Sequence, residues 1–337
     1  MIDLVVAGGG PAGLATAIHA AHAGLETVVV EKRPGPIDKA CGEGLMPHAV
    51  RHLDALGAKP EGVPFRGITY ADAHRAVTAP FARGAGLGVR RTTLHAALLH
   101  AAEAAGVTIV HDRVDGVIQD AESVTVNGIR GRYLAAADGL HSPVRAALGM
   151  GLPPGPMRRW GIRRHVAVPP WSDCVEVHWS REAEAYVTPV AGDCVGVAML
   201  SSRQGRFESH LEAFPVLRER LAGHPHEPDR AAGPLRQRVR SRVAGRVLLV
   251  GDAAGYVDAL TGEGLGLAFE AARLLVAGVL ADRPGDYERQ WRRATRRYRL
   301  MTTAMLHAST SPLRSLIVPA AGGLPRTFTG VVNLLAD

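Results

Sequence analysis

The glycine-rich run GGGPAG at residues 8–13 constrains the fold of this chain more than any other feature. It follows a short apolar stretch at residues 2–6, which is typical of a buried strand, and it opens an alanine-rich stretch at residues 11–23, which is typical of a helix. Residues 26–30 then predict a second buried strand. The start of the chain is therefore predicted to be a strand–helix–strand unit of the Rossmann type.

The residue types in this unit indicate what it binds. Gly8 permits the tight turn after the strand, Gly10 lets the backbone approach a pyrophosphate, and Gly13 lets the helix pack closely against the strand. Glu31 closes the second strand eighteen residues after Gly13, where its carboxylate can accept hydrogen bonds from ribose hydroxyls. The unit therefore predicts a dinucleotide with a free ribose, FAD or NAD, rather than one with a 2′-phosphate.

Composition narrows the class of protein further. A chain of 337 residues with 47% apolar residues can bury the core of one large or two smaller domains. No apolar run reaches the length of a membrane span, and the first residues lack a basic leader, so we expect a cytoplasmic protein. The three cysteines have neither a disulfide pattern nor zinc-ligand spacing. The net charge is +7, but the arginines are spread along the chain, which argues against nucleic-acid binding.

The middle of the chain has a different periodicity. Residues 66–70 and 75–79 predict two short strands, and from about 159 to 200 apolar residues recur with period two. Around residues 174–179, two sets of side chains should face opposite sides of a strand: Val175, Val177 and Trp179 on one face, and Cys174, Glu176 and His178 on the other. This part predicts an antiparallel sheet.

Two further stretches have simple periodic patterns. Residues 113–119 read as another strand, and residues 207–221 read as one amphipathic helix. Long helices are expected up to residue 280 and over residues 287–307.

Two segments far from the glycine run resemble a known flavoprotein class. The sequence ADGLHSPVR at residues 137–145 is similar to the "DG" signature of the class that includes aromatic hydroxylases and geranylgeranyl reductases. The sequence GDAAG at residues 251–255 resembles the second flavin signature of that class, in which the aspartate holds the ribityl chain. Residues 261–264 (TGEG) precede a helix whose N-terminus, in that class, lies near the flavin. The resemblance implies FAD.

Other motifs bear on the branch of that class. The loop KACGEGL at residues 39–45 resembles the Cys-Gly loop of geranylgeranyl reductases, and Arg91 matches an arginine that contacts the cofactor. The segment at residues 186–189 lacks the tryptophan and phenylalanine found in that branch, which argues against a prenyl substrate. The halogenase tryptophan motif and lysine have no counterpart, which argues against a halogenase.

The predicted fold class is α/β, with a three-part Rossmann-like FAD domain of the glutathione-reductase type, an antiparallel substrate sheet and C-terminal helices. We assign residues 1–65, 86–155 and 240–285 to the FAD domain, 66–85 and 156–239 to the substrate domain, and 286–337 to a helical segment. The expected cofactor-binding residues are Gly8, Gly10, Pro11, Ala12, Gly13, Glu31, Lys32, Cys41, Gly42, Arg91, Asp138, Gly139, Gly251, Asp252, Gly262, Glu263 and Gly264.

The resemblance implies an oxidoreductase in which NAD(P)H binds transiently and reduces FAD. We favour a monooxygenase that acts on an apolar or aromatic metabolite through an oxygen adduct at flavin C4a. The alternatives are a geranylgeranyl-reductase-like enzyme that saturates an alkene, a flavin-binding protein or cyclase without redox turnover, and an NAD-dependent dehydrogenase. The candidate catalytic residues are Cys41, His48, Glu176, His178 and Tyr186.

The last part of the chain has its own prediction. Residues 311–335 are apolar but interrupted by prolines and glycines, which favours a cap over the substrate region above a weak peripheral contact with a membrane. We expect a small apolar molecule as substrate, no nucleic-acid partner, and a monomer or homodimer.

Overall fold

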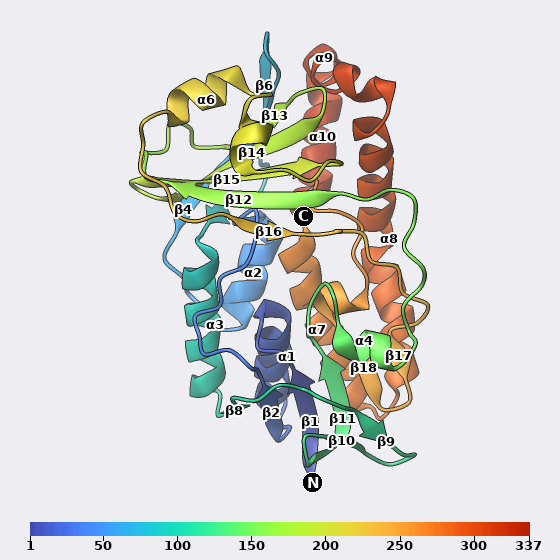
Figure 1. Ribbon diagram of the computed structural model, residues 1–337. Helices are drawn as coiled ribbons and strands as arrows, with labels where there is room; N and C mark the ends of the chain where they lie inside the picture. Colours follow the sequence, from blue (N-terminus) through green and yellow to red (C-terminus); the bar gives the residue numbers. More distant parts are fainter.

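The computed structural model describes all residues, 1–337, and consists of two sheet layers stacked end to end along the molecule (Figure 1). The lower layer contains an eight-stranded sheet with the order β17-β18-β11-β1-β2-β8, to which β10 and β9 are added beside β11. Its strands are β1 (Ile2–Ala7), β2 (Thr27–Val30), β8 (Thr108–Val110), β9 (Ile118–Gln119), β10 (Val124–Val126), β11 (Ile129–Ala136), β17 (Val243–Ala244) and β18 (Val247–Leu249).

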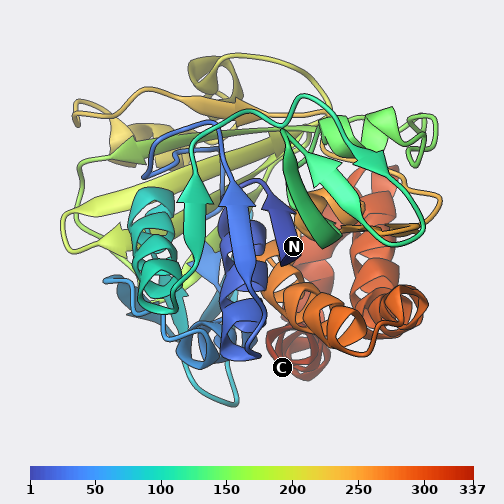
Figure 2. The ribbon, with the colours of Figure 1, turned by 90° about the horizontal axis from the view of Figure 1, so that it is seen from below.

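The centre of this sheet is parallel, since β1 pairs in parallel with both β2 and β11, and the outer neighbours β8 and β18 continue the pattern. Three helices lie side by side on one face of it (Figure 2): α1 (Pro11–His22), α3 (Arg91–Ala104) and α7 (Gly264–Leu280). Parallel sheets are buried on both faces, which explains why β1 and β2 are nearly continuous apolar runs. The predicted Rossmann-type unit is confirmed.

The upper layer is a seven-stranded sheet with the order β16-β12-β15-β14-β13-β5-β6. All neighbours are antiparallel except β13 and β5. Its strands are β5 (Gly67–Ala71), β6 (Ala76–Pro80), β12 (Trp160–Val166), β13 (Val175–Trp179), β14 (Ala183–Ala191), β15 (Cys194–Ser201) and β16 (Arg230–Ala232). A small third sheet joins β3 (Gly44–Leu45), β7 (Gly86–Gly88) and β4 (Val63–Phe65).

The chain ends in a series of helices, α8 (Pro284–Ser309), the 3₁₀ helix η2 (Pro312–Leu316), α9 (Ile317–Gly323) and α10 (Pro325–Ala336). Of these, α8 packs on α7 and β17 of the lower layer, while α9 and α10 lie against the upper sheet (Figure 1). Phe328 of α10 packs on Tyr70 of β5, with ring centroids 4.8 Å apart, and α10 contacts β6. The tail therefore caps the upper sheet, as its sequence predicted. None of the helices combines the length and apolar character needed to cross a bilayer.

Two local predictions are wrong. The single helix over residues 207–221 is divided into α5 (Phe207–Leu211) and α6 (Pro215–Leu221), because proline disfavours a helical conformation at the residue before it. The strand over residues 113–119 is reduced to β9, since this polar stretch lies at the edge of the lower sheet and lacks a buried face. The remaining short elements are α2 (Pro47–Ala55), α4 (Pro143–Ala147) and η1 (Gly251–Ala254).

Candidate functional site

A cavity of about 910 Å³ lies where the two layers meet. The N-terminal ends of α1 and α7 reach it, and so do the turns that follow β11 and β18. In an open parallel sheet, ligands bind beyond the carboxyl ends of the strands, and this cavity occupies that position.

The glycine turn after β1 has room for a ligand on one side and none on the other. Gly8 has a φ of +104°, and a side chain at Gly13 would place its Cβ only 1.9 Å from the carbonyl oxygen of Gly8. A Cβ at Gly10 would meet nothing closer than Nη2 of Arg91, at 3.8 Å. Gly13 therefore permits the helix–strand contact, and Gly10 leaves its backbone open toward the cavity at a helix N-terminus, which suits a phosphate.

Glu31 is held firmly at the end of β2. Its Oε2 accepts a hydrogen bond from the backbone N–H of Gly9 at 2.9 Å, and its Oε1 accepts bonds from the backbone N and the Nε of Arg33 at 3.1 and 3.0 Å. Burial alone would raise the pKa of Glu31, but the bonds from Arg33 and Gly9 lower it below its usual value. The residue is thus an oriented carboxylate, as ribose recognition requires.

The second and third flavin segments are tied to each other. Arg145 donates hydrogen bonds to the carbonyl oxygens of Ala253, at 3.1 Å, and of Leu140, at 2.7 Å. Asp138 accepts a bond from the backbone N–H of Val144 through Oδ2, while its buried Oδ1 has no partner. A buried polar atom without a partner is costly, so Oδ1 of Asp138 is a ready acceptor for a ligand hydroxyl.

Charged side chains gather in the cavity around Asp252. Burial raises the pKa of Asp252, and the nearby positive charges of Lys39, Arg91 and Arg145 oppose that rise. Burial also lowers the pKa of Lys39 and of Arg91, and the Nε of Arg91 has no hydrogen-bond partner. A diphosphate would supply the missing partners. Sequence reasoning did not assign a role to Lys39, although its position in the Cys41 loop was the available signal.

Most of the expected cofactor residues line this cavity, and the others support it from behind. The lining residues are Gly10, Pro11, Ala12, Lys32, Cys41, Gly42, Arg91, Asp138, Gly139, Gly251, Asp252, Gly262 and Gly264. The supporting residues are Gly8, Gly13, Glu31 and Glu263. Of the latter, Glu263 faces His48 of α2, with Oε2 3.1 Å from Nε2 of the imidazole.

Two of the five candidate catalytic residues line the cavity. Burial raises the pKa of the Cys41 thiol and raises that of the Tyr186 phenol well above its usual value, so both hold their protons. The hydroxyl of Tyr186 donates a bond to the carbonyl oxygen of Leu260 at 2.8 Å.

The other three candidates do not line the cavity, and we withdraw them as catalytic groups. His48 lies behind the α7 N-terminus, paired with Glu263. Glu176 and His178 occupy the opposite face of β13 from the cavity residues Val175 and Val177. There Glu176 accepts bonds from Nε1 of Trp171 and from the His178 imidazole. The predicted alternation of β13 is confirmed, but it points these two polar side chains away from the site.

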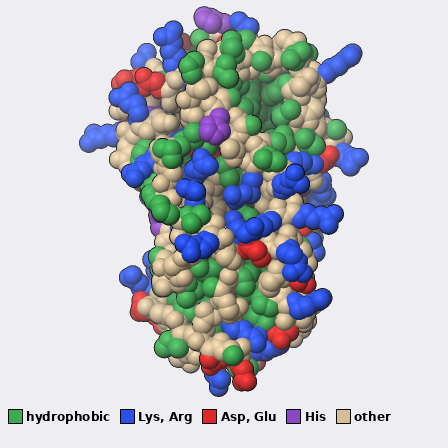
Figure 3. Space-filling view, turned by 90° about the vertical axis from the view of Figure 1, so that its right-hand side faces the viewer, with side chains coloured by type: hydrophobic (Ala, Val, Ile, Leu, Met, Phe, Trp, Pro, Cys, Tyr) green, Lys and Arg blue, Asp and Glu red, His purple; other side chains and the backbone are tan.

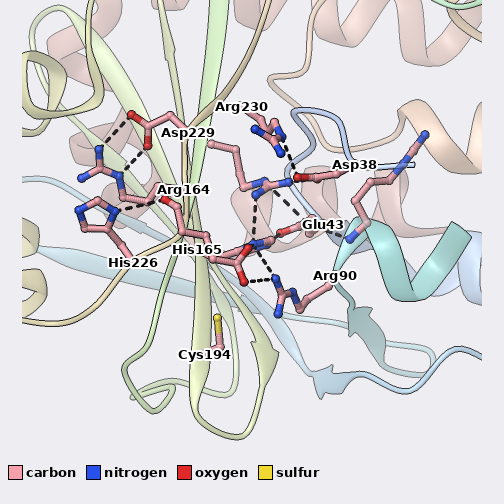
Figure 4. Close-up of polar contacts among 12 residues, drawn as sticks. Asp38, Glu43, Arg90, Arg164, His165, Cys194, His226, Asp229 and Arg230 are labelled. Atoms are coloured by element: carbon pink, nitrogen blue, oxygen red, sulfur yellow. Dashed lines mark hydrogen bonds and ion pairs between the residues drawn. The ribbon is translucent and has the colours of Figure 1, made fainter. Parts of the chain in front are cut away.

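A buried ionic network connects the Cys41 loop to the upper sheet (Figure 4). Glu43 has a φ of 61°, and its carboxylate accepts a bond from the backbone N–H of Arg91 at 2.8 Å. Its other oxygen lies 2.6 Å from Nε2 of His165 on β12, whose Nδ1 lies 2.8 Å from Glu227. Arg163 of the same strand pairs with Asp38. Sequence reasoning missed this network, because its members are brought together only by the fold.

The far end of the cavity is apolar. None of the lining residues contributed by β5, β13, β14, α8 and α10 is charged, although the opposite wall carries the charges described above. These residues are Ile68, Tyr70, Val175, Val177, Tyr186, Thr188, Met301, Met305, Phe328, Val331, Val332 and Leu335. The sequence predicted that residues 311–335 cap the substrate region, but it did not identify which side chains of α8 and α10 line the cavity.

A phosphate-accepting glycine turn, an oriented carboxylate after β2 and an aspartate at each of two further turns define a dinucleotide-binding flavoprotein site. The residues present fit FAD. Residues 1–283 match the family model described as "FAD binding domain", and the chain belongs to that family. The protein is an FAD-dependent oxidoreductase, and NAD(P)H is the reductant typical of the family.

Three known proteins illustrate the likeness. The chain is 30% identical to a menaquinone reductase of Mycolicibacterium smegmatis, over 86% of this chain and 79% of that protein. It is 27% identical to digeranylgeranylglycerophospholipid reductase 2 of Methanopyrus kandleri, over 83% of this chain and 76% of that protein. The structure of the anhydrotetracycline hydroxylase OxyS from Streptomyces rimosus superposes with a TM-score of 0.76 at 24% identity, covering 99% and 76% of the two chains, which shows the shared fold.

Proposed function

We propose that this protein is an NAD(P)H-driven, FAD-dependent reductase that saturates a carbon–carbon double bond in an apolar, isoprenoid-like substrate. The observation that carries the proposal is the division of the cavity, with charged groups and glycines at one end and the uncharged wall of β5, β13, β14, α8 and α10 at the other. Ligand pockets of this kind fix one polar group and enclose the rest of the molecule in apolar side chains.

The menaquinone reductase and the digeranylgeranylglycerophospholipid reductase named above also support a reductase, since the likeness extends over more than four-fifths of this chain in each case. Residues 186–189 lack the tryptophan and phenylalanine of the geranylgeranyl reductases, but other segments of the chain contribute aromatic side chains to the cavity wall. Phe65, Tyr70 and Phe328 all line it. We therefore rank the reductase above the monooxygenase that the sequence favoured.

The chain's own residues have definable tasks in such a reaction. FAD, when bound, would supply the hydride. Saturation of an alkene also needs a proton, and Cys41 and Tyr186 are protonated groups on the cavity wall. The apolar wall would hold the substrate and exclude water from it. We also propose a cytoplasmic location and a monomer or homodimer.

The experiment that tests the proposal is anaerobic. The FAD-loaded protein is reduced with NADPH, a geranylgeranyl lipid is added without oxygen, and flavin absorbance and product mass are followed. Reoxidation of the flavin with a product heavier by two hydrogens is the expected result. Turnover that requires oxygen, with a product heavier by one oxygen, would establish the monooxygenase. A flavin that NADPH and NADH both fail to reduce would favour the non-redox alternative.

A further inference from the structure

The exposed apolar side chains of this protein are concentrated in its C-terminal helices. Ten large apolar side chains are exposed, and six of them lie between residues 300 and 334, which is a small fraction of the chain. They are Leu300, Leu313, Leu316, Leu324, Val331 and Leu334. Single exposed leucines are ordinary, but a concentration of them on consecutive elements marks an interaction surface.

Five of these six side chains face outward, because Leu300, Leu313, Leu316, Leu324 and Leu334 do not line the cavity. Their exposed fractions run from 43% at Leu334 to 61% at Leu300 and at Leu324. The elements that carry them adjoin one another, since η2 contacts both α8 and α9, and α9 contacts α10.

Helix α10 is apolar on both of its sides. Phe328 and Val332 are buried against the upper sheet, whereas Leu324, Val331 and Leu334 are spaced seven and ten residues along one exposed stripe. A helix at the surface of a soluble protein normally has a polar outer face. The exposed polar side chains of α10 are confined to its first turn, at Arg326 and Thr327, and the exposed side chains further along the helix are Val331 and Leu334.

The same part of the chain is strongly basic. Between Glu288 and Asp337 it has eight arginines and neither aspartate nor glutamate. Arg297 of α8 donates to the carbonyl oxygen of Leu334, so a positive charge lies directly beside the exposed stripe of α10, and Arg326 is exposed on α10 itself. Figure 3, which looks onto the side that carries α8, shows basic side chains in a band below the hydrophobic side chains at the α9 end.

This surface is continuous with the cavity. Val331 is 38% exposed and also lines the cavity, as do Val332 and Leu335 of the same helix and Met301 and Met305 of α8. The two helices that expose leucines outward therefore form the apolar wall of the substrate compartment on their inner side.

We propose that η2, α9, α10 and the adjoining end of α8 form a docking surface for an anionic phospholipid bilayer. Exposed leucines would enter the interface between head groups and acyl chains. Arg289, Arg292 and Arg314 are paired with carboxylates, so the exposed Arg293, Arg296, Arg297 and Arg326 would face the anionic head groups. The surface would bring the apolar end of the cavity to the membrane, and this purpose, though not the docking itself, rests on the proposed reductase function.

The test is sedimentation of the full FAD-loaded protein with lipid vesicles. Vesicles of phosphatidylcholine with phosphatidylglycerol are compared with pure phosphatidylcholine vesicles at low and high salt. We expect binding to the anionic vesicles that weakens as salt rises. The variant Leu316→Ser/Leu324→Ser/Leu334→Ser should lower the partition coefficient by at least about tenfold. The matched control is Leu280→Ser, an exposed leucine at the end of α7, which should bind like the parent protein.

Three outcomes would overturn the proposal: no binding to anionic vesicles, equal binding by the triple variant, or equal binding to both kinds of vesicle. If the protein does not bind vesicles but forms a dimer, and the triple variant is a monomer, the surface would be assigned to contact with a second copy of this chain. Vesicle binding needs no turnover, so vesicle binding without alkene reduction would refute the proposed function and leave the docking surface standing.

Discussion

The contact between Gly13 and the Gly8 carbonyl is the point at which a single added carbon should have the largest effect on cofactor binding. A Cβ at residue 13 would lie 1.9 Å from that oxygen, and backbone atoms on both sides cannot give way as a flexible side chain could. Gly13→Val should therefore cost about 1–3 kcal/mol of stability and abolish stoichiometric FAD binding.

The measurement is the ratio of flavin to protein absorbance in protein shown to be folded by circular dichroism. Gly285→Ala is the control, because a Cβ there meets nothing within 4 Å. A folded Gly13→Val protein with a full complement of FAD would show that the glycine turn has been misinterpreted.

His48 and Asp258 should make opposite contributions to the pH dependence of stability. Burial lowers the pKa of His48 from 6.5 to about 4, so between these values the unfolded chain binds more protons and stability is lost as pH falls. Burial raises the pKa of Asp258 from 3.8 to about 6, although Arg159 opposes it, so in that window the native state binds more protons and stability is lost as pH rises.

The expected result is a difference between two variants in urea unfolding at pH 4 to 7. The parent should lose up to about 3 kcal/mol of stability through His48 as the pH falls toward 4, and His48→Gln should not show this loss. The parent should lose a similar amount through Asp258 as the pH rises toward 6, and Asp258→Asn should not show that loss. Parallel pH profiles for the parent and both variants would contradict the burial argument.

At the scale of elements, Phe328 is the largest buried side chain that holds α10 over the cavity. Phe328 is buried between Tyr70 and the other residues of the upper apolar cluster. The polar contacts of α10 include Asn333, whose amide donates to the carbonyl oxygen of Pro80 at 2.9 Å, and Arg297, which donates to the carbonyl oxygen of Leu334. Phe328→Ala should destabilise the packing of α10 by about 3–5 kcal/mol.

Hydrogen exchange is the suitable measurement, because the loss should be local. Amides of α10 should exchange faster in Phe328→Ala, whereas those of α3, which packs on α1 in the lower layer, should keep their rates. Unchanged exchange in α10 would mean that other contacts hold the helix. Equal acceleration in α3 would mean that the two layers unfold together.

For the whole molecule, the network around Glu43 joins the two layers. Removing His165 would leave the Glu43 carboxylate buried, with the Arg91 backbone N–H as its one hydrogen-bond donor within 3.5 Å. Breaking a buried pair by deleting one partner is strongly destabilising, so His165→Ala should lower the free energy of unfolding by about 3 kcal/mol.

The matched control is the exposed pair of Arg203 and Glu182, also at close range, 3.0 Å. Arg203→Ala should cost less than about 1 kcal/mol, since exposed ion pairs are screened by water and salt. Comparable losses in the two variants, measured by urea unfolding, would show that the network around Glu43 contributes nothing special to the contact between the layers.

The sequence by itself determined the features that depend on neighbouring residues. The glycine turn at residues 8–13 lies between a strand and a helix because Gly8 adopts a positive φ that few other residues tolerate. Alternation predicted the faces of β13 correctly. The FAD signatures could be recognised in the sequence because each is a short run of neighbouring residues with its own local geometry.

Only the tertiary structure decided which of these residues meet. Period two separates the faces of a strand but does not say which face is turned to the cavity, so Glu176 and His178 were assigned to the wrong side. The pairing of Glu43 with His165, and the use of α8 and α10 as the apolar wall, join residues more than a hundred positions apart. Such contacts are set by the packing of whole layers, and a local pattern carries no information about them.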